Sequence, residues 1–421
     1  MIIHVTDIIF WFIYIISLYT TIFIIITLIE HKKTAPKKQQ ISPLPRVSVI
    51  VPAHNEEQTI RGTITSLLSL DYPRKLLDII IVNDGSTDNT RKIIEQFKNS
   101  QITIINQENQ GKGAALNNGL KTAKGELVAC LDADSFVEKD TLRLMLPHFI
   151  DPEISAVCPM MKVKNPKNLI EKSQWLEYLL YAFIKMIMAQ IHCINVTPGP
   201  FTIYRKKAIT DIGGFDEKSI VEDQEIAYRL QKAHRRIAQS TQGNVYTVSP
   251  KTLKELYIQR KRWYKGTLIT FYQYRHMLFN KRYGDFGMFQ LPALAAGMLT
   301  LPLVVLLFLN YTIIPFTKDL YHLYLIGFDI MPYLTLQRFN LGLFLTTRWL
   351  STDFAKLFIV ISLFIISVAL MIKAHKETYE KLGVKDIIPV IFFFMIYYII
   401  LSFMWVGSMI ELARGKKSKW S

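Results

Sequence analysis

Residues 77–86 read LDIIIVNDGS, a β-branched run that ends in an acid and a glycine turn. Residues 126–134, ELVACLDAD, repeat this arrangement of an apolar run followed by acids, and residues 47–51, VSVIV, add a third apolar run. Short β-branched runs bounded by turn residues are typical of buried strands, and here they alternate with helical stretches. Because functional groups in such units gather at the carboxyl ends of the strands, we predict an α/β domain over residues 46–272 with its acids at that edge.

The start of the chain has the pattern of a membrane span. Residues 8–29, IIFWFIYIISLYTTIFIIITLI, carry no charge and are long enough to cross a hydrocarbon core of about 30 Å. A cleaved signal peptide would have a basic start, a shorter apolar region and a small-residue cleavage site, which this segment lacks. We therefore predict an N-terminal transmembrane helix within residues 1–30. The basic linker at residues 31–45 then places the following domain in the cytoplasm by the positive-inside rule.

Long apolar runs return after an interfacial segment at residues 273–287. The C-terminal region, residues 288–421, contains three runs of near-spanning length, at about 288–310, 354–372 and 387–410. The stretch 311–350 is also apolar, but prolines and charges interrupt it. It could cross the bilayer, re-enter it or lie along the interface.

The number of spans, four or five, depends on residues 311–350. If they cross, the basic tail at residues 414–419 ends in the cytoplasm, as its charge prefers; if they do not, it ends outside. The lysines between the last two runs argue the opposite way; they are Lys373, Lys376, Lys381 and Lys385. We favour five spans, and in either case a multi-pass protein of the cell membrane with a cytoplasmic domain.

The composition argues against several classes of protein. Half of the 421 residues are apolar and they occur in runs, which argues against an ordinary cytosolic enzyme. The 50 Lys+Arg against 34 Asp+Glu give +16, which suits anionic lipid head groups and phosphate-bearing substrates. No nucleic-acid-binding module accompanies this charge. The three cysteines lie far apart with no C-x-x-C pair, so we expect small buried hydrophobes and neither zinc ligands nor disulfides; they are Cys130, Cys158 and Cys193.

The acids at the strand ends are candidates for nucleotide and metal binding. Asp84 is well placed to meet a nucleotide beside the backbone donors of the following turn, although a turn or a helix cap would also account for it. Asp132 and Asp134 form a D-x-D pair. Hard cations such as Mg²⁺ take carboxylate oxygens and keep positions for substrate phosphates. The pair could instead cap a following helix, but the acid-ended strand upstream favours a metal site.

Two later motifs complete the candidate site. Glu222-Asp223 begins an amphipathic segment, where acids either complement the helix dipole or act as a general base on an acceptor hydroxyl. The sequence QRKRW at residues 259–263 places an amide, a guanidinium and an indole within about one helical turn. This set suits diphosphate binding and stacking on a sugar face. A basic and aromatic belt at the membrane interface is the alternative.

Taken together, these motifs resemble the membrane-embedded family-2 glycosyltransferases. That group includes poly-N-acetylglucosamine, hyaluronan and cellulose synthases and ceramide glucosyltransferases. The resemblance covers residues 46–285, more than half of the chain, and the series D, D-x-D, E-D, Q-x-x-R-W is highly specific. The segments that carry it are PAHNEE at 52–57, DGS at 84–86, NQGKG at 109–113, DAD at 132–134, ED at 222–223 and QRKRW at 259–263.

The resemblance implies a GT-A fold, the Rossmann-like α/β fold of nucleotide-diphospho-sugar transferases, which uses a nucleotide-activated sugar and Mg²⁺ or Mn²⁺. The residues that it assigns to the nucleotide sugar are His54, Asn55, Glu56, Asp84, Lys112, Asp132 and Arg262. Asp132 and Asp134 would ligate the metal. Asp223 would deprotonate the acceptor hydroxyl, which then attacks the anomeric carbon in line and inverts its configuration.

The acceptor side is implied in the same way. The residues assigned to it are Thr197, Pro198, Gly199, Gln259 and Trp263. The two prolines that flank Gly199 differ from the corresponding loops of the named synthases, so this loop does not identify the sugar.

The leading hypothesis is a processive synthase that extends a β-linked polysaccharide from a UDP-sugar, with UDP-N-acetylglucosamine favoured, and passes the product through its own spans. Several spans after the QRKRW motif support this, since a polar chain needs a protein-lined path through lipid. An enzyme that adds one sugar to a lipid is the alternative. A transporter or sensor that merely binds a nucleotide sugar is a third reading, and it has no need for the base, the metal acids and the acceptor-side tryptophan together.

Overall fold

The computed structural model describes residues 5–30, 41–328, 353–380 and 382–415. Its α/β part is built on an eight-stranded mixed sheet in the order β3-β2-β1-β4-β7-β6-β8-β5. The strands are β1 (Val47–Ala53), β2 (Leu77–Asp84), β3 (Ile102–Gln107), β4 (Leu127–Cys130), β5 (Ser135–Val137), β6 (Ile154–Val163), β7 (Thr202–Arg205) and β8 (Arg236–Thr247).

One half of the sheet is parallel and buried on both faces. β1 pairs in parallel with β2 and β4, and β2 pairs in parallel with β3. Val49 and Val51 lie in one apolar layer and Ile50 lies in the other, and all three are fully buried. Because successive side chains of a strand point to opposite faces, a strand covered on both sides is apolar throughout. This explains why β1 and β2 were recognisable as continuous apolar runs.

The other half of the sheet reverses direction next to β4. β7 pairs antiparallel with both β4 and β6, and β5 pairs antiparallel with β8. The D-x-D segment therefore lies at the carboxyl end of β4, beside the reversal. It leads into strand β5, so the alternative that it caps a following helix is wrong.

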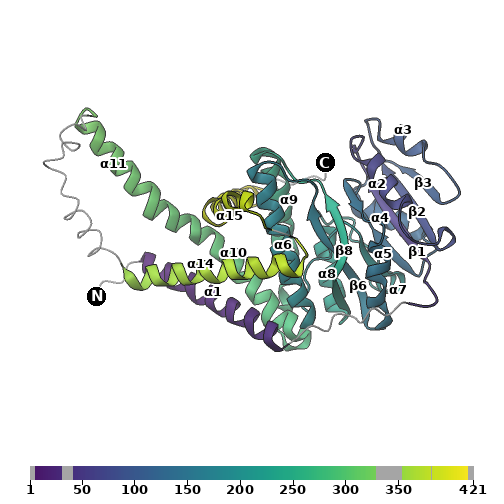
Figure 1. Cartoon of the computed structure of the whole chain (residues 1–421), viewed down its shortest axis with the longest axis horizontal. Helices are drawn as coiled ribbons and strands as arrows, with labels where there is room; N and C mark the ends of the chain where they lie inside the picture. The colour runs from purple at the N-terminus through teal and green to yellow at the C-terminus, as the bar shows by residue number, and fades with distance from the viewer. Residues whose placement is uncertain (1–4, 31–40, 329–352, 381, 416–421) are drawn as a thin grey trace.

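Helices cover the sheet on both sides (Figure 1). They are α2 (Ile60–Leu68), α3 (Thr90–Glu95), α4 (Lys112–Thr122), α5 (Thr141–Met145), α6 (Leu169–Gln190), α7 (Lys206–Asp211), α8 (Glu222–Lys232) and α9 (Leu253–Gln273). Single 3₁₀ turns lie at η1 (Arg74–Leu76), η2 (Leu146–Ile150), η3 (Arg275–Met277), η4 (Lys281–Tyr283) and η7 (Val384–Asp386).

The two long helices of the domain, α6 and α9, have well-defined starts. The Asn168 side chain accepts a hydrogen bond from the Glu171 backbone at 2.9 Å, and the Glu171 carboxylate accepts one from the Asn168 backbone at 3.0 Å. This reciprocal pair is a capping box, which satisfies two backbone donors that a helix otherwise leaves unpaired. At the start of α9 the Thr252 hydroxyl accepts from the Glu255 backbone at 3.2 Å.

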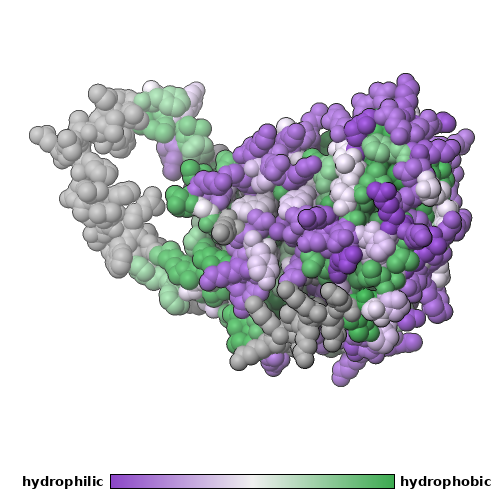
Figure 2. All heavy atoms as spheres, turned by 45° about the vertical axis from the view of Figure 1, so that its right-hand side comes forward, coloured by the Kyte–Doolittle hydropathy of each residue, from purple (hydrophilic) through white to green (hydrophobic). Residues whose placement is uncertain are grey.

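Four helices in the described part of the chain are long and apolar enough to cross a membrane. The first is α1 (Val5–Glu30) and the third is α14 (Phe354–Glu377). The second runs through η5 (Phe286–Gln290), α10 (Leu291–Phe308), η6 (Leu309–Ile313) and α11 (Ile314–Leu325), and the fourth through α15 (Ile387–Phe392), η8 (Phe393–Tyr397) and α16 (Tyr398–Ala413). Hydrophobic side chains gather along the helices that project from the α/β domain, whose own surface is mostly hydrophilic (Figure 2).

The second of these helices is longer than the sequence indicated. We expected an interruption at Pro315, but the helix continues through it to Leu325. Pro315 directly follows the π turn η6, and a local π adjustment of this kind lets a membrane helix accommodate the N–H that proline lacks. The rest of the stretch 311–350, from residue 329 onward, lies outside the described residues.

The three cysteines are free and buried, as the sequence predicts. Cys130 of β4 and Cys158 of β6, two strands separated by β7, belong to the same apolar layer as Cys193. They serve as small hydrophobic side chains of the core.

Candidate functional site

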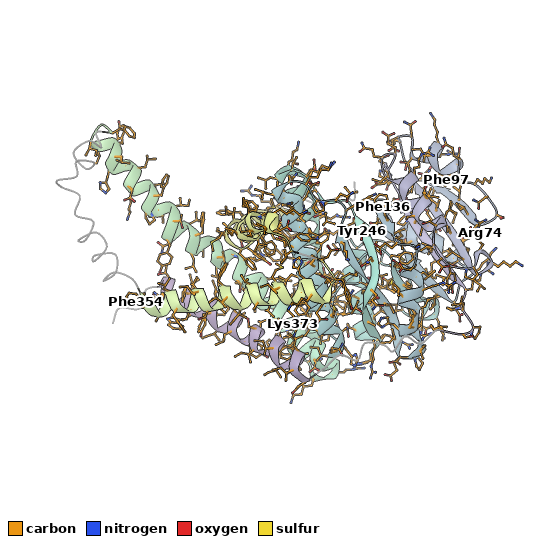
Figure 3. The ribbon with its side chains drawn as sticks, in the orientation of Figure 1. Arg74, Phe97, Phe136, Tyr246, Phe354 and Lys373 are labelled. Atoms are coloured by element: carbon orange, nitrogen blue, oxygen red, sulfur yellow. The ribbon has the colours of Figure 1, made fainter. Side chains whose placement is uncertain are left out.

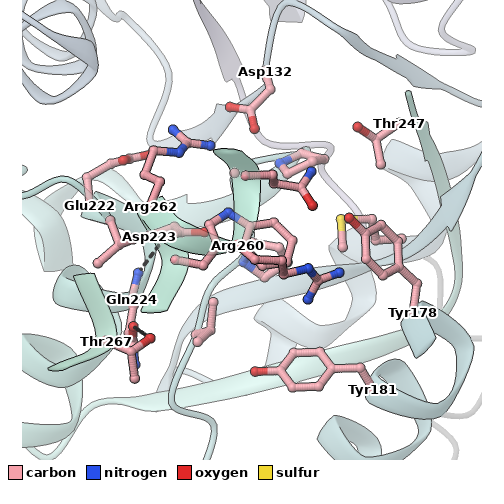
Figure 4. Close-up of a pocket in the computed structure, with 18 of the residues that line it drawn as sticks. Asp132, Tyr178, Tyr181, Glu222, Asp223, Gln224, Thr247, Arg260, Arg262 and Thr267 are labelled. Carbon is pink, nitrogen blue, oxygen red and sulfur yellow. Dashed lines mark hydrogen bonds between the residues drawn. The ribbon is translucent and has the colours of Figure 1, made fainter. Parts of the chain in front are cut away.

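A cavity of 280 Å³ opens at the carboxyl edge of β4, where the D-x-D loop, the start of α8 and one face of α9 converge. Asp132, Asp223 and Arg262 line it together, although 39 to 130 residues separate them along the chain (Figure 4). The sequence motifs lie far apart in the chain, but the fold brings them to one place.

The D-x-D acids are crowded by negative charge. Burial, followed by the charges of Asp132 and Glu56, raises the pKa of the Asp134 carboxyl, and the Ser135 hydroxyl donates to it at 2.9 Å. Burial and the charge of Asp132 likewise raise the pKa of Glu56. Carboxylates held close together in a low-dielectric site favour a bound cation or proton. The Glu56 carboxylate therefore belongs to the same electrostatic cluster as the D-x-D pair.

Lys112 supplies the positive charge that faces this cluster. Its ammonium contacts Asp132 at 2.7 Å and Glu222 at 2.5 Å, from the first residue of α4. Burial alone would lower the pKa of Lys112, but its acidic neighbours outweigh burial and raise it. The lysine is therefore charged, and it bridges the D-x-D loop and the start of α8.

The residues of the cavity suit a divalent cation that completes its coordination with substrate. Asp132 and Asp134 offer hard oxygen donors, and among the described residues no third histidine, cysteine or acid joins them in a closed metal cage. Mg²⁺ usually binds through one or two carboxylates plus substrate phosphates and water. A two-carboxylate site with an electrostatic excess of negative charge fits that mode.

Asp223 is the second residue of α8, and its backbone is anchored from behind. The Thr197 hydroxyl and backbone N–H donate to the Asp223 carbonyl at 2.8 and 3.1 Å. Tyr204 in turn donates to the Thr197 hydroxyl at 3.0 Å. One carboxylate oxygen of Asp223 accepts from the Gln224 backbone at 2.8 Å. Burial, followed by the charge of Glu222, raises the pKa of Asp223 to about 6.

The loop at residues 197–199, predicted to meet the acceptor, supports the acids. Thr197 is fully buried and bonded to Asp223, whereas Pro198 and Gly199 line the cavity. A β-carbon on Gly199 would lie 2.6 Å from a carboxylate oxygen of Asp132. Gly199 therefore permits the loop to approach the D-x-D segment closely.

Asp84 is fully buried at the end of β2, and its carboxylate shapes a loop. It accepts hydrogen bonds from Gln107, from the Gln110 backbone and from the Gly111 backbone, at 2.8, 2.9 and 2.9 Å. Asp88 instead accepts from the Thr90 backbone at 2.9 Å, at the start of α3. Asp88 thus orders the turn before α3, whereas the Asp84 carboxylate orders the loop at residues 107–111.

His54 and Asn55 contact the turn at residues 84–87 that follows β2. A ring nitrogen of His54 lies 2.7 Å from the Asp84 carbonyl oxygen, and the Asn55 side chain accepts from the Thr87 backbone at 2.8 Å. Asn55 has a φ of 54°, a left-handed conformation that asparagine tolerates better than most residues. The structure thus brings His54, Asn55 and Asp84 together around one loop, next to Glu56.

Helix α9 presents the QRKRW motif to the cavity. Gln259, Arg262 and Trp263 line it, and the Gln259 side-chain oxygen is buried with no hydrogen-bond partner among the described residues. In Figure 4 the Arg262 guanidinium points toward Asp132. An unpaired buried acceptor is costly, so the Gln259 oxygen is ready to accept a hydrogen bond from a ligand hydroxyl.

The motif's second residue, Arg260, was not among the predicted site residues. It makes two parallel hydrogen bonds to Glu177 of α6, each of 2.7 Å, and lies over the Trp263 ring at 4.4 Å. A bidentate pair of this kind fixes the guanidinium plane. Arg260 thereby holds the indole in place against the cavity wall.

Sequence reasoning also missed the wall that α6 contributes. Glu177, Tyr181 and Lys185 recur every four residues and line the cavity from one face of the helix. Lys185 is only 5% exposed, and burial lowers its pKa. The available signal was the polar repeat inside an otherwise apolar helix.

Comparison with known proteins gives a consistent picture. Residues 48–213 match the model of the family described as Glycosyl transferase family 2. The poly-beta-1,6-N-acetyl-D-glucosamine synthase of Staphylococcus aureus strain COL is 35% identical over 243 residues, which cover 56% of this chain and 58% of the relative. That of Staphylococcus epidermidis is 36% identical over 224 residues, covering 52% and 54%. The match thus spans a little over half the length of these curated relatives.

A solved structure supports the fold. The mannosyltransferase of Pyrobaculum calidifontis, solved with GDP-Man and Mn²⁺, superimposes with a TM-score of 0.55 at 22% identity, covering 72% of this chain and 88% of that chain. The α/β domain therefore has a GT-A-like fold, and the attached apolar helices indicate a membrane protein. Residues 48–213 of the α/β domain are therefore similar to family-2 glycosyltransferases.

Proposed function

We propose that the chain is an inverting, metal-dependent glycosyltransferase that transfers a hexose or N-acetylhexosamine from a UDP-sugar to a growing β-linked polysaccharide. The observation that carries the proposal is the single cavity lined by Asp132, Asp134, Asp223, Arg262 and Trp263. A domain that only bound a nucleotide sugar would have no need for a half-buried carboxylate of raised pKa in one cavity with an indole and an unpaired amide oxygen.

UDP-N-acetylglucosamine is the favoured donor, because the two staphylococcal relatives are named as synthases of an N-acetylglucosamine polymer. The nucleoside lies against His54, Asn55 and the loop that Asp84 organises. The diphosphate lies between the D-x-D acids and Arg262. Asp132 and Asp134 would hold Mg²⁺ or Mn²⁺, which would supply positive charge to balance the diphosphate.

Lys112 changes partners during this binding. In the present structure its ammonium balances Asp132 and Glu222. With Mg²⁺ or Mn²⁺ held by Asp132, Lys112 would be able to pair with the diphosphate at the amino end of α4. A helix amino terminus with a cation is a favourable environment for phosphate.

Asp223 is the base for the acceptor. Its carboxylate removes the proton of an acceptor hydroxyl while that oxygen forms a bond to the anomeric carbon. The bond from the anomeric carbon to the diphosphate oxygen breaks on the opposite face, so the configuration inverts and UDP leaves. Arg262 stabilises the charge that develops on the departing diphosphate, a preorganised contact whose loss typically costs about 2.7–4 kcal/mol.

The acceptor occupies the part of the cavity formed by α6 and α9. Trp263, held by Arg260, stacks on a sugar face, and the unpaired Gln259 oxygen accepts from a sugar hydroxyl. Processive transfer then moves the product along the apolar helices, with the catalytic domain in the cytoplasm. The positive-inside rule supports this orientation through the basic linker at residues 31–45.

The test is product size. The purified full-length chain in lipid nanodiscs is given radiolabelled UDP-N-acetylglucosamine, UDP-glucose or UDP-galactose with Mn²⁺ or Mg²⁺, with and without lipid acceptor. We expect high-mass product from UDP-N-acetylglucosamine only when metal is present, and none from Asp223→Asn. Label found only in an organic-soluble lipid would replace polymerisation by single transfer. Nucleotide-sugar binding without any transfer would contradict the enzyme assignment.

A further inference from the structure

The last apolar helix, from Ile387 in α15 to Ala413 in α16, differs from the other three in its surroundings. It is long and apolar enough to span a membrane. However, 33% of its most apolar 18-residue stretch is buried inside the protein, whereas the corresponding share is 11% in each of the other three helices. It is therefore much more extensively covered by protein than a helix that projects into lipid.

Both ends of this helix are attached to the catalytic domain. Just before its start, Asp386 pairs with Lys172 of α6 at 3.4 Å. Near its end, Glu411 pairs with Lys265 of α9 at 2.8 Å and accepts from the Tyr257 hydroxyl at 3.1 Å. A helix that crosses the bilayer leaves one end on the opposite side, so contacts at both ends are incompatible with a crossing.

The middle of the helix follows the same surface. The Tyr397 hydroxyl donates to Glu177 of α6 at 2.8 Å. The Trp405 ring meets Tyr264 of α9 edge-on, with 4.8 Å between ring centres. The helix thus lies across α6 and α9 from one end to the other.

The neighbouring apolar helices point in another direction. α1 and α14 run side by side away from the domain, and Asp7 pairs with Lys356 at their outer ends (Figure 1). α14 starts at Phe354 far from the domain and reaches Lys373 beside it (Figure 3), where His375 packs on Trp175 of α6. The last helix is seen nearly end-on in the same view. If α1 and α14 follow the membrane normal, the last helix is parallel to the membrane surface.

The two faces of the last helix suit that position. The residues that face the protein are Pro389, Phe393, Tyr397, Leu401, Met404, Trp405 and Ser408, all buried. The outward face includes Ile388 at 70% and Met395 at 53% exposed, and the segment 387–410 has no charged residue. This exposed apolar face is continuous with the membrane helices, because α16 packs on α10. A single leaflet of the bilayer is the surface that it fits.

We propose that the helix from Ile387 to Ala413 lies in the plane of the membrane on the catalytic side, with its outward face in one leaflet, and does not cross. This inference rests on the proposed placement of the enzyme in the membrane, but it does not depend on the proposed sugar-transfer reaction. The arrangement also settles the conflict in the charge pattern. Lys373, Lys376 and Lys385 precede the helix and the basic tail at residues 414–419 follows it, so both stay on the cytoplasmic side, as the positive-inside rule requires.

Depth measurements test the proposal without any assay of transfer. Single cysteines replace Ile388, Met395, Phe403 and Met409 in the full-length chain, and each carries a fluorophore in vesicles with a nitroxide either near the headgroup or at the acyl terminus. We expect all four positions to lose fluorescence to the shallow quencher, with little loss to the deep one. A profile that is deep at Met395 and Phe403 and shallow at both ends would overturn the proposal.

Matched positions in α14 provide the control. Phe358, Ile361 and Ile365 are also exposed and apolar, and their depth should change along the helix because α14 crosses. The three native cysteines are buried, so labelling of the unsubstituted chain gives the background signal.

A second measurement does not depend on substitutions in the helix. A protease-sensitive tag at the C-terminus should be cleaved from the same side of oriented vesicles as a tag in the domain's exposed loop at residues 97–101. Cleavage from the opposite side would contradict an in-plane helix. If the depth and tag results held while no sugar transfer occurred, the proposed function would fail and the placement of the helix would stand.

Discussion

At the scale of single residues, the acid at position 223 gives the sharpest test of the chemistry. Replacing Asp223 with Asn removes the base but keeps the shape of the side chain and the Thr197 contacts to the backbone carbonyl. We expect turnover to fall by about 10²–10⁴-fold, the usual contribution of general-base catalysis. The dissociation constant for the UDP-sugar, measured by calorimetry, should change little. Near-normal turnover would show that another group acts as the base.

The same residue predicts a pH dependence. A base works only when ionised, and the pKa of Asp223 is raised to about 6 by burial and Glu222. The transfer rate should therefore rise with pH through about 6 and level off above it, whereas an acid of ordinary pKa would already be ionised in that range. The pH profile of kcat/KM for the acceptor measures this. A flat profile between pH 5 and 8 would contradict the assignment.

Gly199 offers a second test at this scale, directed at the D-x-D pair. A β-carbon there would lie 2.6 Å from an Asp132 oxygen, so Gly199→Ala should displace the carboxylate and weaken metal-dependent donor binding. Titration of UDP-sugar binding against Mn²⁺ measures the shift. The control is Gly297→Ala, because no atom lies within 4 Å of its β-carbon position in α10. Equal metal dependence in both variants would exclude the close approach as a factor in metal binding.

At the scale of elements, the contact between α9 and the start of α8 positions the base relative to Arg262 and Trp263. Gly266 of α9 packs on Val221, the residue before Glu222, where a β-carbon would come within 2.4 Å of a methyl group. Gly266→Ala should force the helices apart and cost about 1–3 kcal/mol of folding free energy, as overpacking does. Transfer should fall as well, because the separation of Asp223 from the QRKRW face changes.

A double substitution separates the steric conflict with Val221 from any other cost of replacing Gly266 with alanine. Val221→Ala removes the two methyl groups that the new β-carbon would meet. The pair Gly266→Ala with Val221→Ala should therefore recover thermal stability and transfer relative to Gly266→Ala alone. Failure of the second change to restore either quantity would exclude steric conflict as the cause.

Some helices and strands could be predicted from local sequence patterns and others could not. The strands β1, β2 and β4 and helix α8 were visible as β-branched runs and an amphipathic repeat, because their side-chain period is read directly from the chain. The part of the cavity wall formed by α6 was not predicted. Its polar residues Glu177, Tyr181 and Lys185 form a cavity wall only because α9 lies opposite them in the fold. Likewise, the sequence shows Asp84 at a strand end but not the loop at 107–111 to which its carboxylate is bonded.

At the scale of the whole molecule, a polar network joins the catalytic domain to its last apolar helix. Arg260 of α9, Glu177 of α6 and Tyr397 of η8 share hydrogen bonds of 2.7 to 2.8 Å, and the Arg260 side chain is almost fully buried. Removing one partner of a buried pair leaves an uncompensated charge, at a cost of about 3–5 kcal/mol. Glu177→Gln should therefore lower the melting temperature of the full-length chain in detergent by several degrees, and should also loosen Trp263.

The matched control is an exposed ion pair elsewhere in the domain. Arg91 and Glu95 pair at 2.9 Å, with side chains 60% and 50% exposed. Such a pair contributes about 0–1 kcal/mol, so Glu95→Gln should leave the melting temperature almost unchanged. If both variants melted alike, the network would not connect the domain to the helix energetically.

The sequence by itself was sufficient for the buried strands, the acids at their ends, the apolar helices and the family resemblance, because each depends on residue type at short, regular spacing. Tertiary structure decided which of these meet. It placed Lys112 between Asp132 and Glu222, anchored Asp223 through Thr197, assigned Arg260 to Glu177, and laid the last apolar helix along α6 and α9. These arrangements join segments up to 214 residues apart, so they arise from packing and charge pairing that no local period encodes.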